Sequence, residues 1–364
     1  MDDRNINLAY FITAHGFGHA SRSCAVINKM SQYNPDYYFH IFTNLPEWFL
    51  FESLNNKFSY IPIKSDVGLV QESPFRENIH ETINELKDFI PFIRSKYDQI
   101  CDYIVNTKCK LILCDISPLG IFLGKILNIS SVLIENFTWD WIYEPYKNSD
   151  PNFLQSINYY KSIYKQQNYH IQTEPICNQS YNIDLLAPPI SRIPKTNYSL
   201  IRNRLGIKKN KKMILITMGG VPSSVAIPDD LQDNEAFTFV VPCNTKTIKS
   251  INNIIYLPHH SNYYHPDLIN ACDAVITKLG YSTIAEAYHA KVPMGYITRP
   301  RFRESKILED FVKKNMSGDE IKLNNGILNL NLYMLESLLN KNISNNHVSN
   351  GSEEIANFLT NLLD

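Results

Sequence analysis

Short apolar runs alternate with helical patterns along the first half of the chain. Five of these runs have the length and composition of buried strands, namely residues 8–13, 38–43, 58–62, 111–115 and 131–135. Helix-period patterns lie between them, most clearly over residues 21–30 and over a long stretch from about 79 to 106. Strands that alternate with helices predict a parallel sheet with helices on both faces, the α/β class.

The second half repeats this arrangement. Its apolar runs cover residues 212–218, 237–241, 254–257, 274–277 and 294–297. A polar segment, residues 191–197, follows Pro188-Pro189-Ile190 and is the best candidate for a linker. We therefore expect an N-terminal domain over residues 1–190 and a C-terminal domain over 191–350. The tail, 351–364, is expected to form an amphipathic helix that can pack back on the first domain.

Composition narrows the class of protein. A chain of 364 residues with 44% hydrophobic residues suits two packed domains. Its 35 Lys and Arg balance 36 Asp and Glu, which argues against nucleic acid or a membrane surface as a partner. The polar N-terminal residues do not have the pattern of a signal peptide. No apolar stretch is long enough to predict a transmembrane segment. Seven scattered cysteines without a C-x-x-C pair indicate free thiols in a reducing compartment, so we expect a cytoplasmic protein, monomeric or homodimeric.

A glycine-rich turn follows the first apolar run and reads T-A-H-G-F-G-H-A-S-R, residues 13–22. Gly16 and Gly18 would let a ligand approach the backbone closely, at the start of a helix that favours negative charge. His15 and His19 bracket the turn. This segment could therefore hold an anion or a sugar and also supply a general base.

An aspartate ends the apolar run 111–115. Asp115 would lie at the same sheet edge as His19, close enough to orient the imidazole and stabilise its charged form. The alternative is an ordinary helix cap or a turn-forming aspartate.

An aromatic loop follows the next run and reads N-F-T-W-D-W, residues 136–141. Its rings could form an apolar platform for a sugar, with Asn136 and Asp140 as hydrogen-bonding groups. They could equally plug the domain core.

Three segments of the second half could bind a phosphate. Gly219-Gly220 ends a predicted strand and offers backbone N–H groups, although it lacks the pattern of a P-loop. The segment T-K-L-G-Y-S-T-I-A-E-A, residues 277–287, places hydroxyls at a helix start and Glu286 one turn later, where it could accept from both hydroxyls of a ribose. These residues could instead be a helix cap and a first-turn acid. The arginines of R-P-R-F-R-E-S, residues 299–305, could neutralise a diphosphate or lie in a solvated loop.

Taken in this order, the motifs resemble those of GT-B glycosyltransferases. The likeness is to MurG-like enzymes and, more closely, to the glycosyltransferase-like N-terminal half of plant arabinokinases, which carries similar A-H-G-F-G-H-A-S-R, N-F-T-W-D-W-I-Y and T-K-L-G-Y-S-T-I-A-E-A motifs. It runs from about residue 8 to residue 312. The resemblance implies a GT-B fold, in which two Rossmann-like, doubly wound domains face across a cleft. The N-terminal domain would bind the acceptor and the C-terminal domain a nucleotide sugar.

The resemblance also implies roles for individual residues. His19 matches the catalytic base and Asp115 its acidic partner. Glu286 matches a ligand of the donor ribose, and the backbone near Leu257 would meet the base. The donor-binding residues implied in this way are Gly219, Gly220, Leu257, Lys278, Gly280, Tyr281, Ser282, Thr283, Glu286, Arg303, Glu304 and Ser305. The acceptor-binding candidates are His15, Gly16, Phe17, Gly18, Asn136, Trp139 and Asp140. The segment R-F-R-E-S replaces the D-x-x-Q of many members, so the resemblance leaves the donor sugar open.

We therefore expect an inverting glycosyltransferase that transfers a sugar from a nucleotide-diphosphate donor, expected to be UDP-linked, to a hydroxyl acceptor. No cofactor or metal is implied, and the sequence has no D-x-D pair to hold one. Two rival hypotheses stay open. One is a nucleotide-sugar hydrolase on the same fold, and the other is a sugar-nucleotide-binding module without catalysis.

Overall fold

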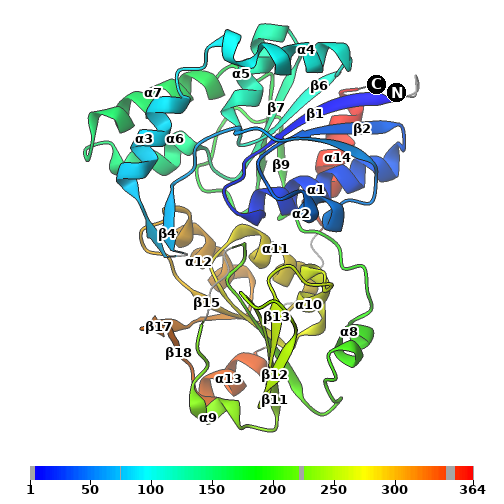
Figure 1. Cartoon of the computed structure of the whole chain (residues 1–364), viewed down its shortest axis with the longest axis vertical. Helices are drawn as coiled ribbons and strands as arrows, with labels where there is room; N and C mark the ends of the chain where they lie inside the picture. The colour runs from blue at the N-terminus through cyan, green and yellow to red at the C-terminus, as the bar shows by residue number, and fades with distance from the viewer. Residues whose placement is uncertain (1–4, 74, 221–224, 342–348, 364) are drawn as a thin grey trace. The chain divides into compact units, whose positions relative to one another are not determined.

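The chain divides into two compact units in the computed structural model, which describes residues 5–73, 75–220, 225–341 and 349–363 (Figure 1). Unit 1 comprises the residues up to Ser191 together with those from Ser349 onward, and unit 2 runs from Arg192 to Val348.

Unit 1 is built on a sheet of seven strands in the order β3-β2-β1-β6-β7-β8-β9, with every neighbouring pair parallel. The strands are β1 (Ile6–Ile12), β2 (Tyr37–Phe42), β3 (Phe58–Ile61), β6 (Leu111–Asp115), β7 (Ser131–Glu135), β8 (Tyr169–Thr173) and β9 (Leu185–Ala187). The five strands expected in this half are confirmed within about two residues at each end. The strand β8 was not predicted, because its sequence mixes polar and apolar residues and forms no apolar run.

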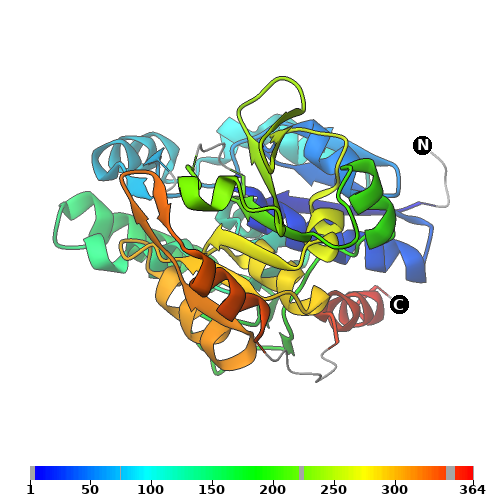
Figure 2. The same cartoon turned by 90° about the horizontal axis from the view of Figure 1, so that it is seen from below.

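Helices cover both faces of this sheet. One face carries α1 (Phe17–Tyr33), α2 (Glu47–Ser53) and α14 (Gly351–Asn361), and α14 lies against α1 in both views (Figures 1 and 2). The other face carries α4 (Asp98–Asn106), α5 (Pro118–Leu127), α6 (Trp139–Tyr143) and α7 (Pro151–Tyr164), with α3 (Ile79–Phe89) against α7. Short elements complete the unit: β4 (Gln71–Ser73), β5 (Arg76–Glu77), η1 (Arg94–Tyr97) and η2 (Glu144–Tyr146).

The helical pattern expected over residues 79–106 is present, but it does not form one continuous helix. The structure has α3 and α4 instead, separated by a break that contains Pro91 and by the turn η1. Proline has no N–H to donate and disfavours helical geometry in the residue before it. Ile90 accordingly ends α3 in an extended conformation.

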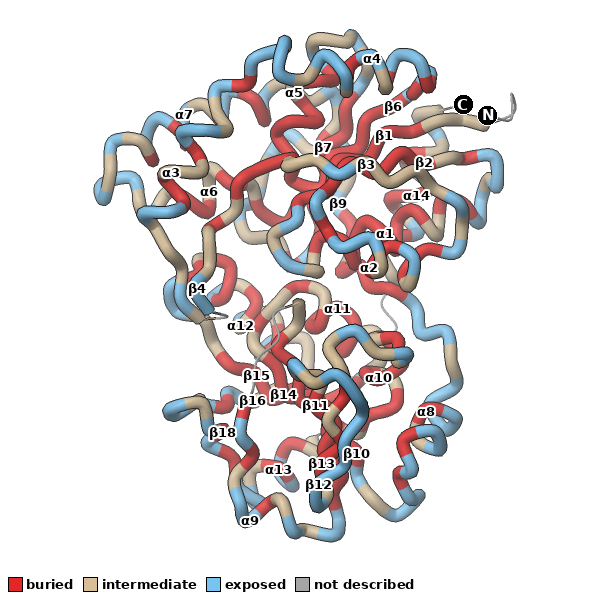
Figure 3. The backbone as a smooth tube through the Cα atoms, in the orientation of Figure 1, coloured by how far each residue is buried: buried red, intermediate tan, exposed pale blue. Residues whose placement is uncertain are grey.

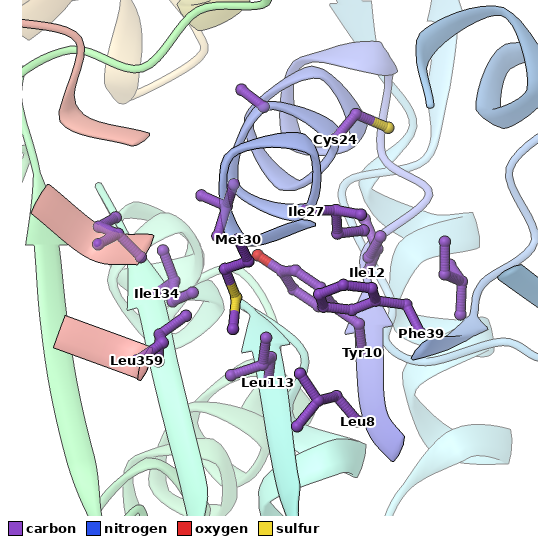
Figure 4. Packing of buried hydrophobic residues seen from close by; sticks show 14 of the residues in the cluster. Leu8, Tyr10, Ile12, Cys24, Ile27, Met30, Phe39, Leu113, Ile134 and Leu359 are labelled. Carbon is purple, nitrogen blue, oxygen red and sulfur yellow. The ribbon is translucent and has the colours of Figure 1, made fainter. Parts of the chain in front are cut away.

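One hydrophobic core of unit 1 lies between the sheet and the helices α1 and α14. Side chains of β1 (Leu8, Tyr10, Ile12), of α1 (Ile27, Met30) and of α14 (Leu359) pack together there (Figure 4). The central strands are buried along most of their length, which explains why they appear in the sequence as continuous apolar runs (Figure 3).

Unit 2 contains a second seven-stranded sheet in the order β12-β13-β11-β10-β14-β15-β16, parallel except for the edge strand β12. Its strands are β10 (Lys212–Thr217), β11 (Phe237–Cys243), β12 (Lys249–Ile251), β13 (Ile254–Pro258), β14 (Ala274–Lys278), β15 (Met294–Ile297) and β16 (Gly318–Glu320). A small ribbon of β17 (Lys322–Asn324) and β18 (Ile327–Asn329) stands apart from it. All five strands expected in this half are present.

The helices of unit 2 are α8 (Tyr198–Arg204), α9 (Asp229–Gln232), α10 (His265–Ala271), α11 (Tyr281–Ala290), α12 (Glu304–Asn315) and α13 (Leu332–Leu339). In both sheets the first strand of the unit lies in the interior of the sheet, and the chain crosses from one side of that strand to the other. Ligands of such sheets bind at the carboxyl ends of the strands next to this reversal. The reversal falls between β1 and β6 in unit 1 and between β10 and β14 in unit 2.

Candidate active site

A histidine and an aspartate meet at the reversal point of unit 1. Asp115 ends β6 and pairs in register with Ile12, the last residue of β1. The chain turns at Gly16, whose φ of 79° suits glycine, and begins α1 directly after it. His19 therefore stands in the first turn of α1, and its Nδ1 lies 2.7 Å from Oδ1 of Asp115.

An arginine that sequence reasoning did not single out completes this group. Arg22 Nε donates to Asp115 Oδ2 at 2.8 Å, and its Nη2 donates to Oδ1 at 2.6 Å. Ser23 Oγ donates to Oδ2 at 3.1 Å. Arg22 follows His19 by three residues, so the two side chains share one face of α1. That spacing within the motif, a cation one turn after the histidine, is the signal that could have revealed it.

The surroundings of Asp115 fix which nitrogen of His19 carries the proton. Burial alone would raise the pKa of Asp115, but Arg22 and then His19 outweigh it and hold that pKa below its usual range. Nη2 of Arg22 also lies 3.2 Å from Nδ1 of His19, but it makes its shorter hydrogen bond, 2.6 Å, to Oδ1 of Asp115. An ionised carboxylate can only accept hydrogen bonds, so the 2.7 Å contact with Oδ1 assigns the proton to Nδ1 of His19. In neutral His19 the other nitrogen, Nε2, then has a lone pair and can take a proton from a substrate.

Asn136 lies behind Arg22. Its Oδ1 accepts from Nη1 of Arg22 at 2.8 Å, and the side chain is buried, with 1% of its surface exposed. Thr173 Oγ1 accepts from the same nitrogen at 3.2 Å. The expected role of Asn136 as a direct contact for an acceptor is therefore replaced in this structure by support of the Arg22 guanidinium.

The aromatic loop packs into the core. Trp139 has no exposed surface and stacks on Tyr143 at 6.1 Å between ring centroids, and Phe137 is also buried. The edge of His15 meets Trp139 at 5.1 Å. Of the two alternatives for this loop, the structure therefore has the core plug, and Trp139 as an open platform for a sugar is wrong. Asp140 is intermediate in exposure, and burial raises its pKa.

A second buried carboxyl at this edge was also missed. Asp66, in the loop after β3, accepts a hydrogen bond from Thr13 Oγ1 at 2.9 Å. Burial raises the pKa of Asp66 to about 7, and the charge of Asp115 adds to the effect. Two residues later, Gly68 lies directly against the ring of His15, because a Cβ there would be 2.4 Å from Nδ1.

The corresponding edge of unit 2 brings together two of the predicted phosphate segments. β10 and β14 are neighbours, and Gly219-Gly220 follows β10 while Lys278 ends β14. A Cβ on Gly219, where φ is 65°, would lie 3.7 Å from Cε of Lys278. Burial lowers the pKa of Lys278 to about 7, and the nearby Arg299 adds to this shift.

The helix α11 begins beside Lys278. Gly280 is its N-cap residue, and no side chain caps it. Tyr281 and Thr283 are buried and Ser282 is intermediate in exposure, so among these three the Ser282 side chain reaches solvent most readily. The first backbone N–H groups of an uncapped helix favour an anion.

Glu286, one turn further along α11, is held by two residues that were not predicted. Its Oε1 accepts from Nε and Nη2 of Arg192 at 3.1 and 3.0 Å, and its Oε2 lies 2.7 Å from Nδ1 of His265. Burial would raise the pKa of Glu286, but Arg192 and His265 hold it below its usual range. Both oxygens are thus engaged in this structure, and a ribose would have to share them.

The remaining donor candidates lie around the same sheet. Glu304 and Ser305 begin α12 and are buried, and Ser305 Oγ accepts from the backbone N–H of Arg299 at 2.8 Å. Arg303 is intermediate in exposure. The side chain of Leu257, in β13, is fully buried, so only its backbone is available to a ligand.

Within the ranges that the structure describes, no group of three or more His, Cys, Asp or Glu side chains could hold a metal ion. No helix in those ranges is both long and apolar enough to cross a membrane. The thiols of Cys101, Cys109, Cys114, Cys243 and Cys272 are not in disulfides.

Comparison with known proteins supports the fold. No family model matches the chain. It aligns over nearly its whole length with the glycosyltransferase of kitacinnamycin (TM-score 0.62, 11% identity, 98% of this chain and 99% of that one). A UDP-glucosyltransferase from Polygonum tinctorium, described as capable of glucosylating indoxyl, aligns with a TM-score of 0.60 at 10% identity over 99% of this chain and 93% of that one. The chain has the GT-B fold. The expected fold class is thereby confirmed for each of the two Rossmann-like units.

One curated protein matches most of the chain in sequence. This GT-B chain is 24% identical over 323 residues to the L-arabinokinase of Arabidopsis thaliana. The match covers 87% of the chain but 30% of that protein, so the chain spans less than a third of the relative's length.

Proposed function

We propose that this protein is an inverting, metal-independent glycosyltransferase that uses a UDP-linked sugar and a hydroxyl acceptor. The observation that carries the proposal is the contact between Nδ1 of His19 and Asp115. It leaves Nε2 as the proton acceptor at the carboxyl edge of a Rossmann-like sheet, where such sheets bind their ligands.

The proposed reaction is a direct displacement. An acceptor hydroxyl gives its proton to Nε2 of His19 while its oxygen forms a bond to the anomeric carbon. The bond from that carbon to the diphosphate oxygen breaks, and its electron pair leaves with UDP. Asp115 stabilises the imidazolium that forms, which keeps the transferred proton on His19 during the step.

Features of unit 2 support binding of the donor diphosphate. The backbone N–H groups at the start of α11 and near Gly219 favour phosphate oxygens. Lys278 lies between these two segments, and a phosphate beside it would restore its positive charge. Glu286, already oriented by His265 and Arg192, is the candidate for the ribose hydroxyls.

Neighbouring proteins guide the choice of substrates. The fold neighbours include a UDP-glucosyltransferase and a plant enzyme whose structure is described as complexed with UDP. The sequence relative is named for L-arabinose. UDP-glucose and UDP-L-arabinose therefore form the first donor panel. They are screened by thermal shift, because a ligand specific to the folded state raises its melting temperature.

The test is transfer by wild type, His19→Ala and the control His80→Ala, whose histidine is exposed on α3. We expect His19→Ala to lose roughly 10²–10⁴-fold in kcat, the usual contribution of a general base. His80→Ala should keep wild-type activity. Full activity of His19→Ala would remove the proposed role, and sugar release without an acceptor would establish a hydrolase instead.

A further inference from the structure

We propose that Arg22 is a positioning residue that keeps Nε2 of His19 free of a proton, because it holds the Asp115 carboxylate in its ionised form. The catalytic consequence of this role rests on the proposed function, but the role itself does not. The protonation of His19 can be measured without any substrate.

The guanidinium of Arg22 is fixed on both sides. Nε and Nη2 form a parallel pair of hydrogen bonds with the two oxygens of Asp115, and Nη1 donates to Asn136 and Thr173. Nη2 also lies 3.2 Å from Nδ1 of His19, farther than the 2.6 Å that separates it from Oδ1 of Asp115. Only 1% of the Arg22 surface is exposed. An arginine stays charged at every pH at which the protein is folded, and its planar fork matches a carboxylate. Arg22 therefore supplies a permanent positive charge of fixed orientation beneath the site.

The charge balance around Asp115 depends on this arginine. Three residues of α1 hydrogen-bond or contact the carboxylate, namely His19, Arg22 and Ser23. Three further titratable groups interact with its charge, namely Tyr10 of β1, Cys114 of β6 and Asp66 in the loop after β3. Burial raises the pKa of Tyr10 and of Cys114, so both stay neutral. Arg22 is thus the one permanent cation in this group, and Asp66 can only add negative charge.

Without Arg22 the buried carboxylate would need a proton from elsewhere. If Asp115 took up the proton, its O–H would donate to Nδ1 of His19, and the imidazole would adopt the tautomer with a proton on Nε2. If His19 took up the proton instead, both ring nitrogens would carry one. In each case Nε2 could no longer accept a proton from a substrate hydroxyl.

NMR of the histidine nitrogens measures directly which ring nitrogen of His19 carries a proton. Protein labelled with 15N at histidine gives long-range 1H–15N spectra in which bare and protonated ring nitrogens have clearly different shifts, and His19→Gln assigns the signals. Wild type, Arg22→Met and Arg22→Lys are compared at one pH just above neutrality. Arg94→Met, at an exposed arginine of η1, serves as the control. Thermal melts establish that each variant is folded.

We expect a bare Nε2 and a protonated Nδ1 in wild type and in Arg94→Met. Arg22→Met should show a protonated Nε2, and Arg22→Lys, which keeps the charge but not the fork, should restore the wild-type pattern in part. A folded Arg22→Met variant with a bare Nε2 would overturn the proposal. So would a wild-type His19 that carries its proton on Nε2, and this second result needs no variant to fold.

Measurements of activity distinguish a failure of this inference from a failure of the proposed function. If wild type transfers sugar, Arg22→Met should lose roughly 10²–10⁴-fold in kcat with KM nearly unchanged, since general-base help is lost while binding groups remain. If no transfer is found but Nε2 becomes protonated in Arg22→Met, the proposed function fails and the role of Arg22 holds. If transfer is found and Nε2 stays bare, the role of Arg22 fails.

Discussion

Oε2 of Glu286 lies 2.7 Å from Nδ1 of His265, and the same carboxylate accepts two contacts from Arg192 through Oε1. A carboxylate, a histidine and an arginine also meet at Asp115 in unit 1, where His19 and Arg22 share the two oxygens. Each unit thus buries a carboxylate near the edge where its sheet reverses and pairs it with an arginine and a histidine. A buried carboxylate is costly unless it is paired in this way.

Glu286→Gln should therefore destabilise unit 2. We expect a loss of about 3–5 kcal/mol in the free energy of unfolding at neutral pH, since Arg192 would be left buried without its counter-charge. The pKa of Glu286 is lowered in the folded protein, so its contribution is present above the unfolded pKa and is lost as pH falls through the folded value. Denaturant titrations at neutral and acid pH, with exposed Glu235→Gln as control, measure both effects. A variant as stable as the control at neutral pH would contradict this account.

The contribution of Asp66 to the free energy of unfolding should depend on pH in the opposite direction from that of Glu286, and Asp66→Asn tests this. The pKa of Asp66 rises from 3.8 to about 7 on folding, so the folded state binds more protons between these values and the free energy of unfolding falls as pH rises through this window. At about pH 8 we expect the variant to be roughly 1–4 kcal/mol more stable than wild type, with the difference shrinking toward about pH 4. Urea melts across this range test it, with exposed Asp88→Asn as the control. A difference that does not change with pH would show that Asp66 titrates normally.

Lys278 should take up a proton when UDP binds. Its pKa is lowered to about 7 by burial, and phosphate oxygens beside it would favour the charged form. At about pH 8, titration calorimetry in buffers of different ionisation enthalpy should reveal net proton uptake. Lys278→Met should bind UDP more weakly and without proton uptake, whereas Lys209→Met, at an exposed lysine, should behave as wild type. Equal proton uptake by Lys278→Met would assign the effect to another group.

Gly68→Ala should disturb the turn that carries the two histidines. The new Cβ would lie 2.4 Å from Nδ1 of His15, so the imidazole would have to move. We expect a cost of about 1–3 kcal/mol, as for other overpacked sites. The double variant with His15→Ala should recover most of that loss, which a thermal or urea melt can measure. If the double variant were no more stable than Gly68→Ala, the clash would lie elsewhere.

The pattern of apolar residues was sufficient to find most of the sheet. Parallel strands covered on both faces need apolar side chains along their whole length, and the ten runs in the sequence correspond to strands in the structure. It failed where tertiary context compensates for polar residues. In β8, His170 and Gln172 are buried because Glu135 accepts a hydrogen bond from Gln172 and lies 2.9 Å from His170. A single sequence does not show that such a partner exists.

The candidate site was predicted only in part, for a similar reason. The turn after β1 and the carboxylate at the end of β6 indicated His19 and Asp115, because parallel strands end at a common edge. Arg22 is three residues from His19 in the sequence, yet its role depends on Asn136 and Thr173 from other strand ends. Asn136 was expected to contact an acceptor, but the loop that contains it packs into the core of unit 1.

The sequence by itself determined the alternation of strands and helices, the two-part organisation and the histidine at the start of α1, because these follow from local periodicity and from the order of elements along the chain. Only the tertiary structure decided which charges neutralise one another. Asp115 and Glu286 each meet an arginine that is distant along the chain, 93 and 94 residues away. Such pairings depend on how strands are ordered in the sheet, and the free energy of a buried carboxylate is set by these neighbours rather than by its own segment.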